Sequence, residues 1–256
     1  MRAVQKSVLT ICGPSLLIAA ASLVLVCGLA GCASLPPGER DPRDHVERFN
    51  RTMYKFDSTL DRAVIRPLAR RYVKETPAPV RTGVSNFLTN LGYTRTIVND
   101  LLQARCKDFA NDLARLIVNT TLGLGGILDP ATKLQLAKHD RDFGQTLGKW
   151  GVHSGSYLVL PLFGPSDMRD AFAILPDRFM TIEGYVPGAA PDASLISLHA
   201  VDTRANALPT DSTVSSAYDP YAFVRSAWLQ QREYKIHEGD PHYVPDLPPL
   251  AMEPRQ

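Results

Sequence analysis

The strongest constraint on this chain is a long apolar run that ends at Cys32. Residues 10–31 carry no charge, and the chain before them holds only two charged side chains, Arg2 and Lys6. The run is as long as the roughly 20 apolar residues that a membrane-spanning helix needs. A Gly-Pro pair interrupts it, however, and leaves Ser15–Leu29 as an apolar segment of signal-peptide size behind a basic start. The run alone therefore fits either a retained membrane helix or a cleaved export signal.

The residues at the end of this run favour cleavage. Leu29, Ala30 and Gly31 stand directly before Cys32. In this order they resemble the lipobox of bacterial lipoproteins, in which small residues fit the signal peptidase and the cysteine thiolate takes a lipid. We therefore expect Cys32 to be the acylated first residue of the working protein. The next residue, Ala33, is not the aspartate that retains many lipoproteins in the inner membrane, so the sequence resembles one sorted to the outer membrane.

The net charge and the number of cysteines both change once the predicted signal peptide is removed. The chain holds 28 basic and 26 acidic residues, and removal of two basic residues with the signal (28 − 2 = 26) leaves a formally neutral protein. That balance argues against a nucleic-acid-binding protein. Two of the four cysteines leave with the signal and Cys32 carries the lipid, so only Cys106 remains. One thiol excludes both an internal disulfide and a thiolate metal site.

The rest of the chain divides into a tether, a helical domain and a tail. We assign residues 1–31 to the signal peptide, 32–43 to a lipidated tether, 44–236 to one helical domain and 237–256 to a Pro-rich disordered tail. No stretch alternates as a strand does, so the predicted fold class is all-α. Periodic apolar residues predict helices at 44–64, 80–91, 94–121, 193–208 and 219–234.

Local signals mark the ends of these helices. Asp44 and Glu47 form an aspartate version of a capping box, and Pro67 should end or kink the first helix. Glycines in the range 123–126 end the longest helix, and Asp219, followed by proline, should cap the last one. The longest helix is amphipathic, with Leu101, Leu113 and Ile117 on its apolar side and Asp100, Asp108 and Arg115 on its polar side.

No complete catalytic or metal-binding motif is present. Phe143–Trp150 resembles a phosphate loop, but three residues instead of four separate its glycines, and Trp150 replaces the required Ser or Thr. His139–Asp142 could supply acid and base groups, yet no nucleophile stands near them. His237 and His242 flank two acids within the Pro-rich tail, which is a weak pattern for a metal. We assign no catalytic residue, no metal ligand and no cofactor.

One apolar segment does not behave like the predicted helices. Tyr157–Phe163 reads YLVLPLF and is flanked by glycine and proline. It is too short to span a bilayer. It fits either a buried, strand-like connector or an apolar loop that dips into one leaflet.

Long motifs cover nearly all of the predicted mature chain, from about Asp41 to Ile236. They read ERFNRTMYKFDSTLDRAVIRPLARRY (47–72), PVRTGVSNFLTNLG (79–92), VNDLLQ (98–103), NTTLGLGGILDPA (119–131), DFGQTLGKWGV (142–152), SYLVLPLFGPSDMRD (156–170) and YDPYAFVRSAWLQQREY (218–234). In this order they resemble the VacJ/MlaA family of outer-membrane phospholipid-transport lipoproteins.

The resemblance implies an all-helical, ring-like (doughnut) protein in the inner leaflet of the bacterial outer membrane. Amphipathic helices would turn apolar faces to acyl chains and polar faces to a central channel. The implied function is non-catalytic removal of mislocalised phospholipids from the outer leaflet, which maintains lipid asymmetry. The implied partners are phospholipid, a trimeric outer-membrane porin, a periplasmic phospholipid-binding carrier and, indirectly, an inner-membrane ABC transporter, but no nucleic acid.

Within this picture the apolar segment is a candidate lipid-facing surface. Its members are Tyr157, Leu158, Val159, Leu160, Pro161, Leu162 and Phe163. Two other functions stay open. One is a structural envelope lipoprotein that acts as a porin adaptor, and the other is a lipid-modifying hydrolase, which would need a nucleophile and a positioned base.

Overall fold

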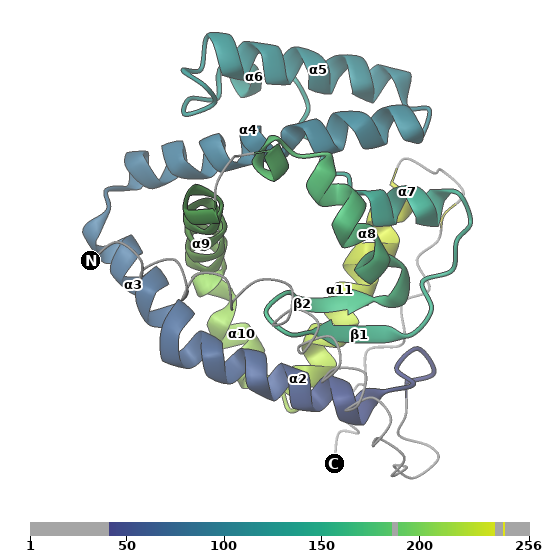
Figure 1. Cartoon of the computed structure of the whole chain (residues 1–256). Helices are drawn as coiled ribbons and strands as arrows, with labels where there is room; N and C mark the ends of the chain where they lie inside the picture. Colours follow the sequence, from purple (N-terminus) through teal and green to yellow (C-terminus); the bar gives the residue numbers. More distant parts are fainter. Residues whose placement is uncertain (1–40, 186–188, 239–242, 244–256) are drawn as a thin grey trace, which may run out of the picture.

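Helices arranged in a ring make up most of the described chain (Figure 1). The computed structural model describes residues 41–185, 189–238 and 243, so the signal peptide and the lipobox residues Leu29, Ala30, Gly31 and Cys32 lie outside the described part. The elements are α2 (Glu47–Leu60), η1 (Asp61–Ile65), α3 (Arg66–Glu75), α4 (Ala78–Leu102), α5 (Cys106–Thr121), α6 (Pro130–Lys133), α7 (Phe143–Lys149), β1 (Tyr157–Leu160), β2 (Gly164–Asp167), α8 (Met168–Phe179), η2 (Ile182–Tyr185), α9 (Ala189–Ala207), η3 (Leu208–Thr210), α10 (Asp211–Ser216) and α11 (Pro220–Ile236).

The ring is built from segments that are distant in sequence. Helices α2 and α3 form its lower left side in Figure 1, α4 runs along the top, and α7 and α8 lie on the right. Helix α9 lies between α3 and α4 and packs against both. Helices α5 and α6 lie on the outer side of α4, away from the centre of the ring. The ring-like helical fold is therefore confirmed, with one short hairpin added.

The side of the ring made by α2 and α3 is a single helical path. Pro67 lies in the first turn of α3, where a missing N–H costs little. A π-helical turn, Asp61–Ile65, directly precedes α3 and changes the winding of the helix there. Pro67 was expected to end or kink the helix, and the structure shows that the chain stays helical through it.

The break between the two longest helices differs from the prediction. Helix α4 runs through Gly92 to Leu102, and the chain turns at Ala104, whose φ is +57°. The predicted break at residues 92–93 and the predicted single helix 94–121 are therefore wrong. The turn contains neither glycine nor proline, so the sequence gives no local signal for it.

The helix caps were predicted with mixed success. Asp219 caps α11 as expected, because its carboxylate accepts from the backbone N–H of Tyr221 at 3.0 Å. The predicted capping box at Asp44 is wrong. The buried Asp44 carboxylate instead accepts from Asn50 at 2.7 Å and from Arg225 at 2.8 Å, and so joins α2 to α11.

A small aromatic core lies where the hairpin meets α2 and α11. Tyr157 and Val159 of β1 pack with Tyr221 of α11, and Trp228 lies against them. The β1–β2 hairpin is antiparallel and pairs Tyr157 with Asp167. Side chains in a strand alternate between its two faces, so Tyr157 and Val159 point inward while the two leucines between and after them are half-buried. The strand-like connector is thus the correct interpretation for residues 157–160.

Candidate functional site

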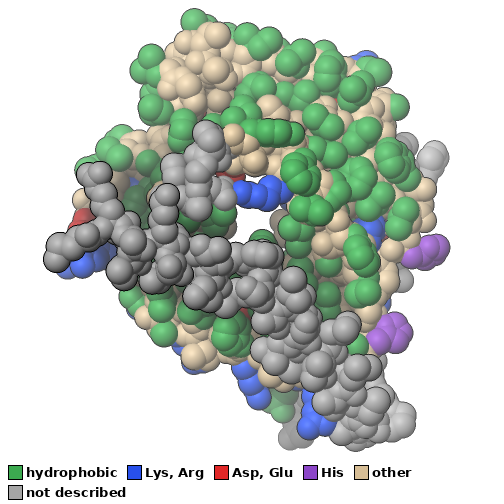
Figure 2. All heavy atoms as spheres, in the orientation of Figure 1, with side chains coloured by type: hydrophobic (Ala, Val, Ile, Leu, Met, Phe, Trp, Pro, Cys, Tyr) green, Lys and Arg blue, Asp and Glu red, His purple; other side chains and the backbone are tan. Residues whose placement is uncertain are grey.

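The centre of the ring is open. Figure 2 shows a gap through the molecule, with Lys or Arg atoms reaching into it and Asp or Glu atoms at its edge. The gap lies within the circle made by α2, α3, α4, α8 and α9 in Figure 1. We call this gap the ring opening. Charged groups at its edge make it suited to polar parts of a ligand.

The left side of the ring is closed by a network of ion pairs. Arg204 of α9 donates to Asp61 at 2.6 Å and to Asp211 at 2.7 Å, and Arg66 lies 3.0 Å from Asp61. Partial burial opposes ionisation of Asp61, but the two arginines together hold its pKa below the usual value. Asp61 belongs to the π-helical turn, so that turn positions the joint between α3 and α9.

The right side is closed by a second network. Arg232 of α11 donates to both oxygens of Asp142 at 2.6 Å and also pairs with Asp170 of α8. Burial raises the pKa of Asp142, but the bidentate arginine outweighs it and lowers the pKa to about 2. Asp142 also caps α7 through the backbone N–H of Gln145 at 2.8 Å. One carboxylate therefore joins α7 to α11.

A third network holds the segment 134–142 against α4 and α5. Arg141 is 1% exposed, and its guanidinium pairs with Asp100 of α4 and, at 2.9 Å, with Asp108 of α5. Asp100 is fully buried. A buried charge is tolerated only when it is paired and hydrogen-bonded, so this arginine is a structural requirement of the joint.

A second buried carboxylate lies beside the first. Asp112 of α5 accepts from the Tyr93 hydroxyl at 3.0 Å and contacts Nδ1 of His139 at 2.9 Å. Burial and the contact with Asp112 raise the pKa of Asp100 to about 7, against the opposing effect of Arg141. This carboxyl is therefore harder to ionise than an aspartate in water.

Apolar side chains lie on the outside of the ring beside the opening. Figure 2 shows hydrophobic side chains gathered on the right of the opening, over α8. Exposed residues recur along α8 and into η2 at intervals of three and four, which is one face of a helix. We call them the α8 stripe: Met168, Phe172, Leu175, Phe179 and Ile182, of which Phe172 is 73% and Leu175 63% exposed. An exposed apolar face of this kind marks an interaction surface.

The seven candidate lipid-facing residues are divided by the structure. Tyr157 and Val159 are 1% exposed and belong to the core, because β1 turns them inward. Leu158, Leu160 and Pro161 are half-buried. Leu162 and Phe163, in the hairpin turn, are 69% and 72% exposed. A lipid-facing role is therefore withdrawn for Tyr157 and Val159 and stays a proposal for the other five residues, Leu158, Leu160, Pro161, Leu162 and Phe163.

The residues that resembled catalytic groups have structural contacts. His139 contacts Asp112, Asp140 pairs with Lys235 at 2.7 Å, and Asp142 pairs with Arg232. The segment that resembled a phosphate loop is helix α7. Over residues 41–185, 189–238 and 243, no group of three His, Cys, Asp or Glu side chains could hold a metal ion. Among the helices of that same part, none is long and apolar enough to cross a membrane.

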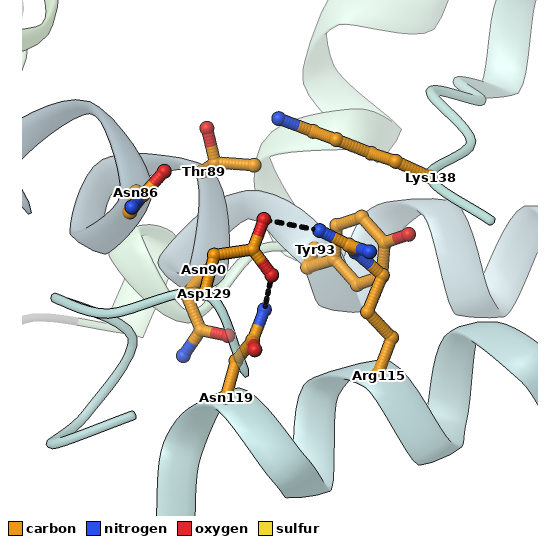
Figure 3. Close-up of a pocket in the computed structure, with 8 residues that line it drawn as sticks. All are labelled: Asn86, Thr89, Asn90, Tyr93, Arg115, Asn119, Asp129 and Lys138. Carbon is orange, nitrogen blue, oxygen red and sulfur yellow. Dashed lines mark hydrogen bonds and ion pairs between the residues drawn. The ribbon is translucent and has the colours of Figure 1, made fainter. Parts of the chain in front are cut away.

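A small polar pocket lies between α4, α5 and the segment that follows α6. Figure 3 shows the side chains that line it: Asn86, Thr89, Asn90, Tyr93, Arg115, Asn119, Asp129 and Lys138. Because α5 and α6 lie on the outer side of α4, this pocket is separate from the ring opening. None of these residues was singled out as a site from the sequence.

Most of the residues that shape the ring were also missed. Arg204 and Asp61 are 143 positions apart, and Arg232 and Asp142 are 90 apart. In sequence Arg204, Asp61 and Arg232 each read as one more charge on a solvated helix face, and Asp142 was considered only as part of the acid and base group His139–Asp142. The only local signal was Asp142, which stands directly before a helix and could have been recognised as an N-cap.

Comparison with known proteins places the chain among envelope lipoproteins. The model of the MlaA lipoprotein family matches residues 42–235. The intermembrane phospholipid transport system lipoprotein MlaA of Escherichia coli K12 is 35% identical over 217 residues, which cover 83% of this chain and 86% of that protein. The protein of the same description in Haemophilus influenzae is 31% identical over 224 residues, covering 85% and 90%.

A solved structure has the same fold. It comes from work on the structural basis for maintenance of bacterial outer membrane lipid asymmetry, and it superimposes with a TM-score of 0.69 at 32% sequence identity. The match covers 77% of this chain and 100% of the other. The similarity extends over almost all of the ring, so it concerns the whole arrangement of helices.

Proposed function

The chain belongs to the MlaA lipoprotein family, and from that premise we propose how its ring handles phospholipid. It is an outer-membrane-associated lipoprotein of phospholipid transport. We propose that mislocalised phospholipids leave the outer leaflet through the ring opening and pass to a periplasmic carrier, so that transport is retrograde and lipid asymmetry is maintained.

One observation carries this proposal: an open ring with charged groups at its opening lies next to an exposed apolar stripe (Figure 2). A phospholipid has the same division between a charged head and apolar tails. A charged group costs several kcal/mol, on the order of 3 or more, at the centre of hydrocarbon. A polar opening lowers that cost for the head, while the tails lie along the α8 stripe.

We propose that Cys32 anchors the ring in the periplasmic leaflet of the outer membrane. The several acyl chains of a lipoprotein hold a protein stably, whereas one chain does so only marginally, at about 0.8 kcal/mol per buried methylene. The proposed neighbours are a trimeric porin and a periplasmic phospholipid-binding carrier, with an inner-membrane ABC transporter further along the route. Cys32→Ala should leave the precursor unprocessed and transport abolished.

The transport proposal involves no catalysis. The acid and base groups near α7 are held in ion pairs, and the proposed route breaks no covalent bond. Incubation of purified protein with labelled phospholipid should therefore release no product. Release of a fatty acid or headgroup would instead favour a lipid-modifying hydrolase.

The decisive test uses a deletion strain complemented with variants. We expect the deletion to enrich phospholipid in the outer leaflet and sensitise cells to detergent, and the wild-type gene to reverse both. Phe172→Asp/Leu175→Asp should fail to complement, while the matched pair Phe172→Leu/Leu175→Ile, which keeps both positions apolar, should succeed. An unchanged outer leaflet in the deletion strain would refute transport. Copurification of a porin without any phospholipid would favour the structural adaptor.

A further inference from the structure

The polar pocket lies outside the ring, and hydrogen bonds between α5 and the segment around α6 hold one of its sides in place. Arg115, 3% exposed, donates to Asp129 at 2.6 Å, to Thr132 at 2.9 Å and to the backbone oxygen of Leu136 at 2.7 Å. Asn119 donates to the other oxygen of Asp129 at 3.0 Å. Arg115 thus balances the charge of the Asp129 carboxylate, and both oxygens of this carboxylate already accept hydrogen bonds. These bonds fix α5 and the segment after α6 in place before any ligand arrives.

Two groups on the other walls have no such partner. Figure 3 shows the Lys138 side chain extending over the pocket toward the α4 side, where Thr89 lies. Within residues 41–185, 189–238 and 243, neither the Lys138 amine nor the Thr89 hydroxyl has a hydrogen bond or ion pair. Lysine is protonated at neutral pH. Among the residues that line the pocket, Arg115 is matched by Asp129, so Lys138 adds a positive charge without a paired carboxylate and Thr89 adds a hydroxyl donor.

A loop with exposed apolar side chains adjoins the pocket. The loop that leads into it exposes Ile127 by 47% and Leu128 by 52%, and Leu134 beyond α6 is 60% exposed. Asn86, a lining residue, donates to the backbone oxygen of Ile127 at 3.2 Å, so the apolar loop adjoins the pocket itself. The positive charge of Lys138 in the polar pocket can pair with an anion, and the exposed aliphatic side chains beside it can cover a hydrocarbon chain attached to that anion.

We propose that this pocket binds the phosphate group of a phospholipid, separately from the ring opening. Lys138 forms the ion pair with a phosphate oxygen, Thr89 donates a hydrogen bond to it, and the acyl chains lie over Ile127, Leu128 and Leu134. Lysine is a usual point-charge partner of phosphate, and a single positive charge suits the single negative charge of a phosphodiester. Only the choice of phospholipid as the anion rests on the proposed function.

The test measures binding to the purified acylated protein by calorimetric titration. The probes are dihexanoyl phosphatidylglycerol below its micelle concentration, inorganic phosphate, and dihexanoylglycerol, which lacks phosphate. The short-chain phospholipid should bind more tightly than either of the others. Lys138→Gln should weaken it by about tenfold, the usual scale of one charge-assisted hydrogen bond, and Thr89→Val should weaken it by a smaller factor.

The matched control is Lys133→Gln, which removes an exposed lysine of α6 that does not line the pocket. It should bind like wild type. Equal affinities of Lys138→Gln and Lys133→Gln would overturn the proposal. Equal binding of inorganic phosphate and the short-chain phospholipid would identify a free-phosphate site and overturn the lipid assignment. Binding is read on purified protein and transport in cells, so either proposal can fail while the other stands.

Discussion

The joint between α4 and α5 buries charged side chains, whereas the α8 stripe exposes apolar ones. At the joint, Arg141 and Asp100 are almost completely buried, whereas on the stripe Phe172 and Leu175 are mostly exposed. Helix α5 shows the same inversion, because its Arg115 is buried while its Ile117 is 53% exposed. Among the described residues, buried polar side chains outnumber buried apolar ones.

This contrast explains how a ring can stay open in an apolar surrounding. A soluble protein gains its stability chiefly from buried hydrocarbon, but a ring around an opening has too little interior for that. Here ion pairs and hydrogen bonds fix the joints, and apolar surface is left on the outside, where acyl chains can cover it. The two regions should therefore respond differently to substitution, and that difference can be measured.

The largest expected effect is at the buried joint. Arg141→Ala leaves Asp100 and Asp108 without their main partner and should lower the free energy of unfolding by about 3–5 kcal/mol. Chemical denaturation of the purified protein measures this. Arg71→Ala, which breaks an exposed pair with Glu75, is the control and should cost about 1 kcal/mol or less. Equal losses from the two variants would contradict the view that the joints carry the fold.

A smaller effect should appear as a pH dependence. The pKa of Asp100 is raised from 3.8 to about 7 in the folded protein, so between these values the folded state binds more protons than the unfolded state. Its contribution to stability is therefore present at low pH and is lost as the pH rises through this window. Asp167 and Asp177, with pKa values raised to about 6 by burial, act in the same direction.

Asp100→Asn removes one of these groups and tests the assignment. Denaturation midpoints measured from pH 4 to pH 8 should decline less steeply in this variant than in wild type. Glu75→Gln, at an exposed position, should leave the wild-type slope unchanged. A wild-type stability that rises over this range would show that Asp100 is ionised in the fold.

The smallest effect on stability is expected at the α8 stripe. Phe172→Asp/Leu175→Asp should change the free energy of unfolding by no more than about 0.5 kcal/mol per site, because both side chains are exposed. The same variant should bind phospholipid vesicles about tenfold more weakly or worse, since each buried Phe or Leu is worth about 1.5–3 kcal/mol. Vesicle flotation measures this, and the apolar pair Phe172→Leu/Leu175→Ile should float like wild type.

The sequence predicted what depends on local periodicity and on family resemblance. The helical class, the ring and the Asp219 cap follow from such signals and are confirmed. The turn at Ala104 could not be predicted, since tertiary contacts and not a glycine impose it. Tyr157 and Val159 were misplaced because an apolar run gives no sign of which strand face is buried.

The joints escaped prediction for a different reason. Arg141, Arg204 and Arg232 each pair with a carboxylate more than 30 residues away, so their role exists only in the folded ring. On a helical projection Arg204 and Arg232 read as solvated charges, and Arg141 lies in the segment His139–Asp142, which was considered only for acid and base chemistry. The polar side of α5 is the clearest case: Arg115 was placed on it correctly, yet its side chain is 3% exposed and lies inside.

The central claim is that the α8 stripe lies among acyl chains while charged positions of the ring do not. Spin labels at positions 172 and 75, each in a Cys106→Ser background, test it in the acylated protein reconstituted into phospholipid bilayers. The measurement compares relaxation by oxygen, which concentrates in hydrocarbon, with relaxation by a water-soluble nickel complex. We predict that oxygen dominates at position 172 and the nickel complex at position 75. Dominant relaxation by the nickel complex at position 172 would contradict the account.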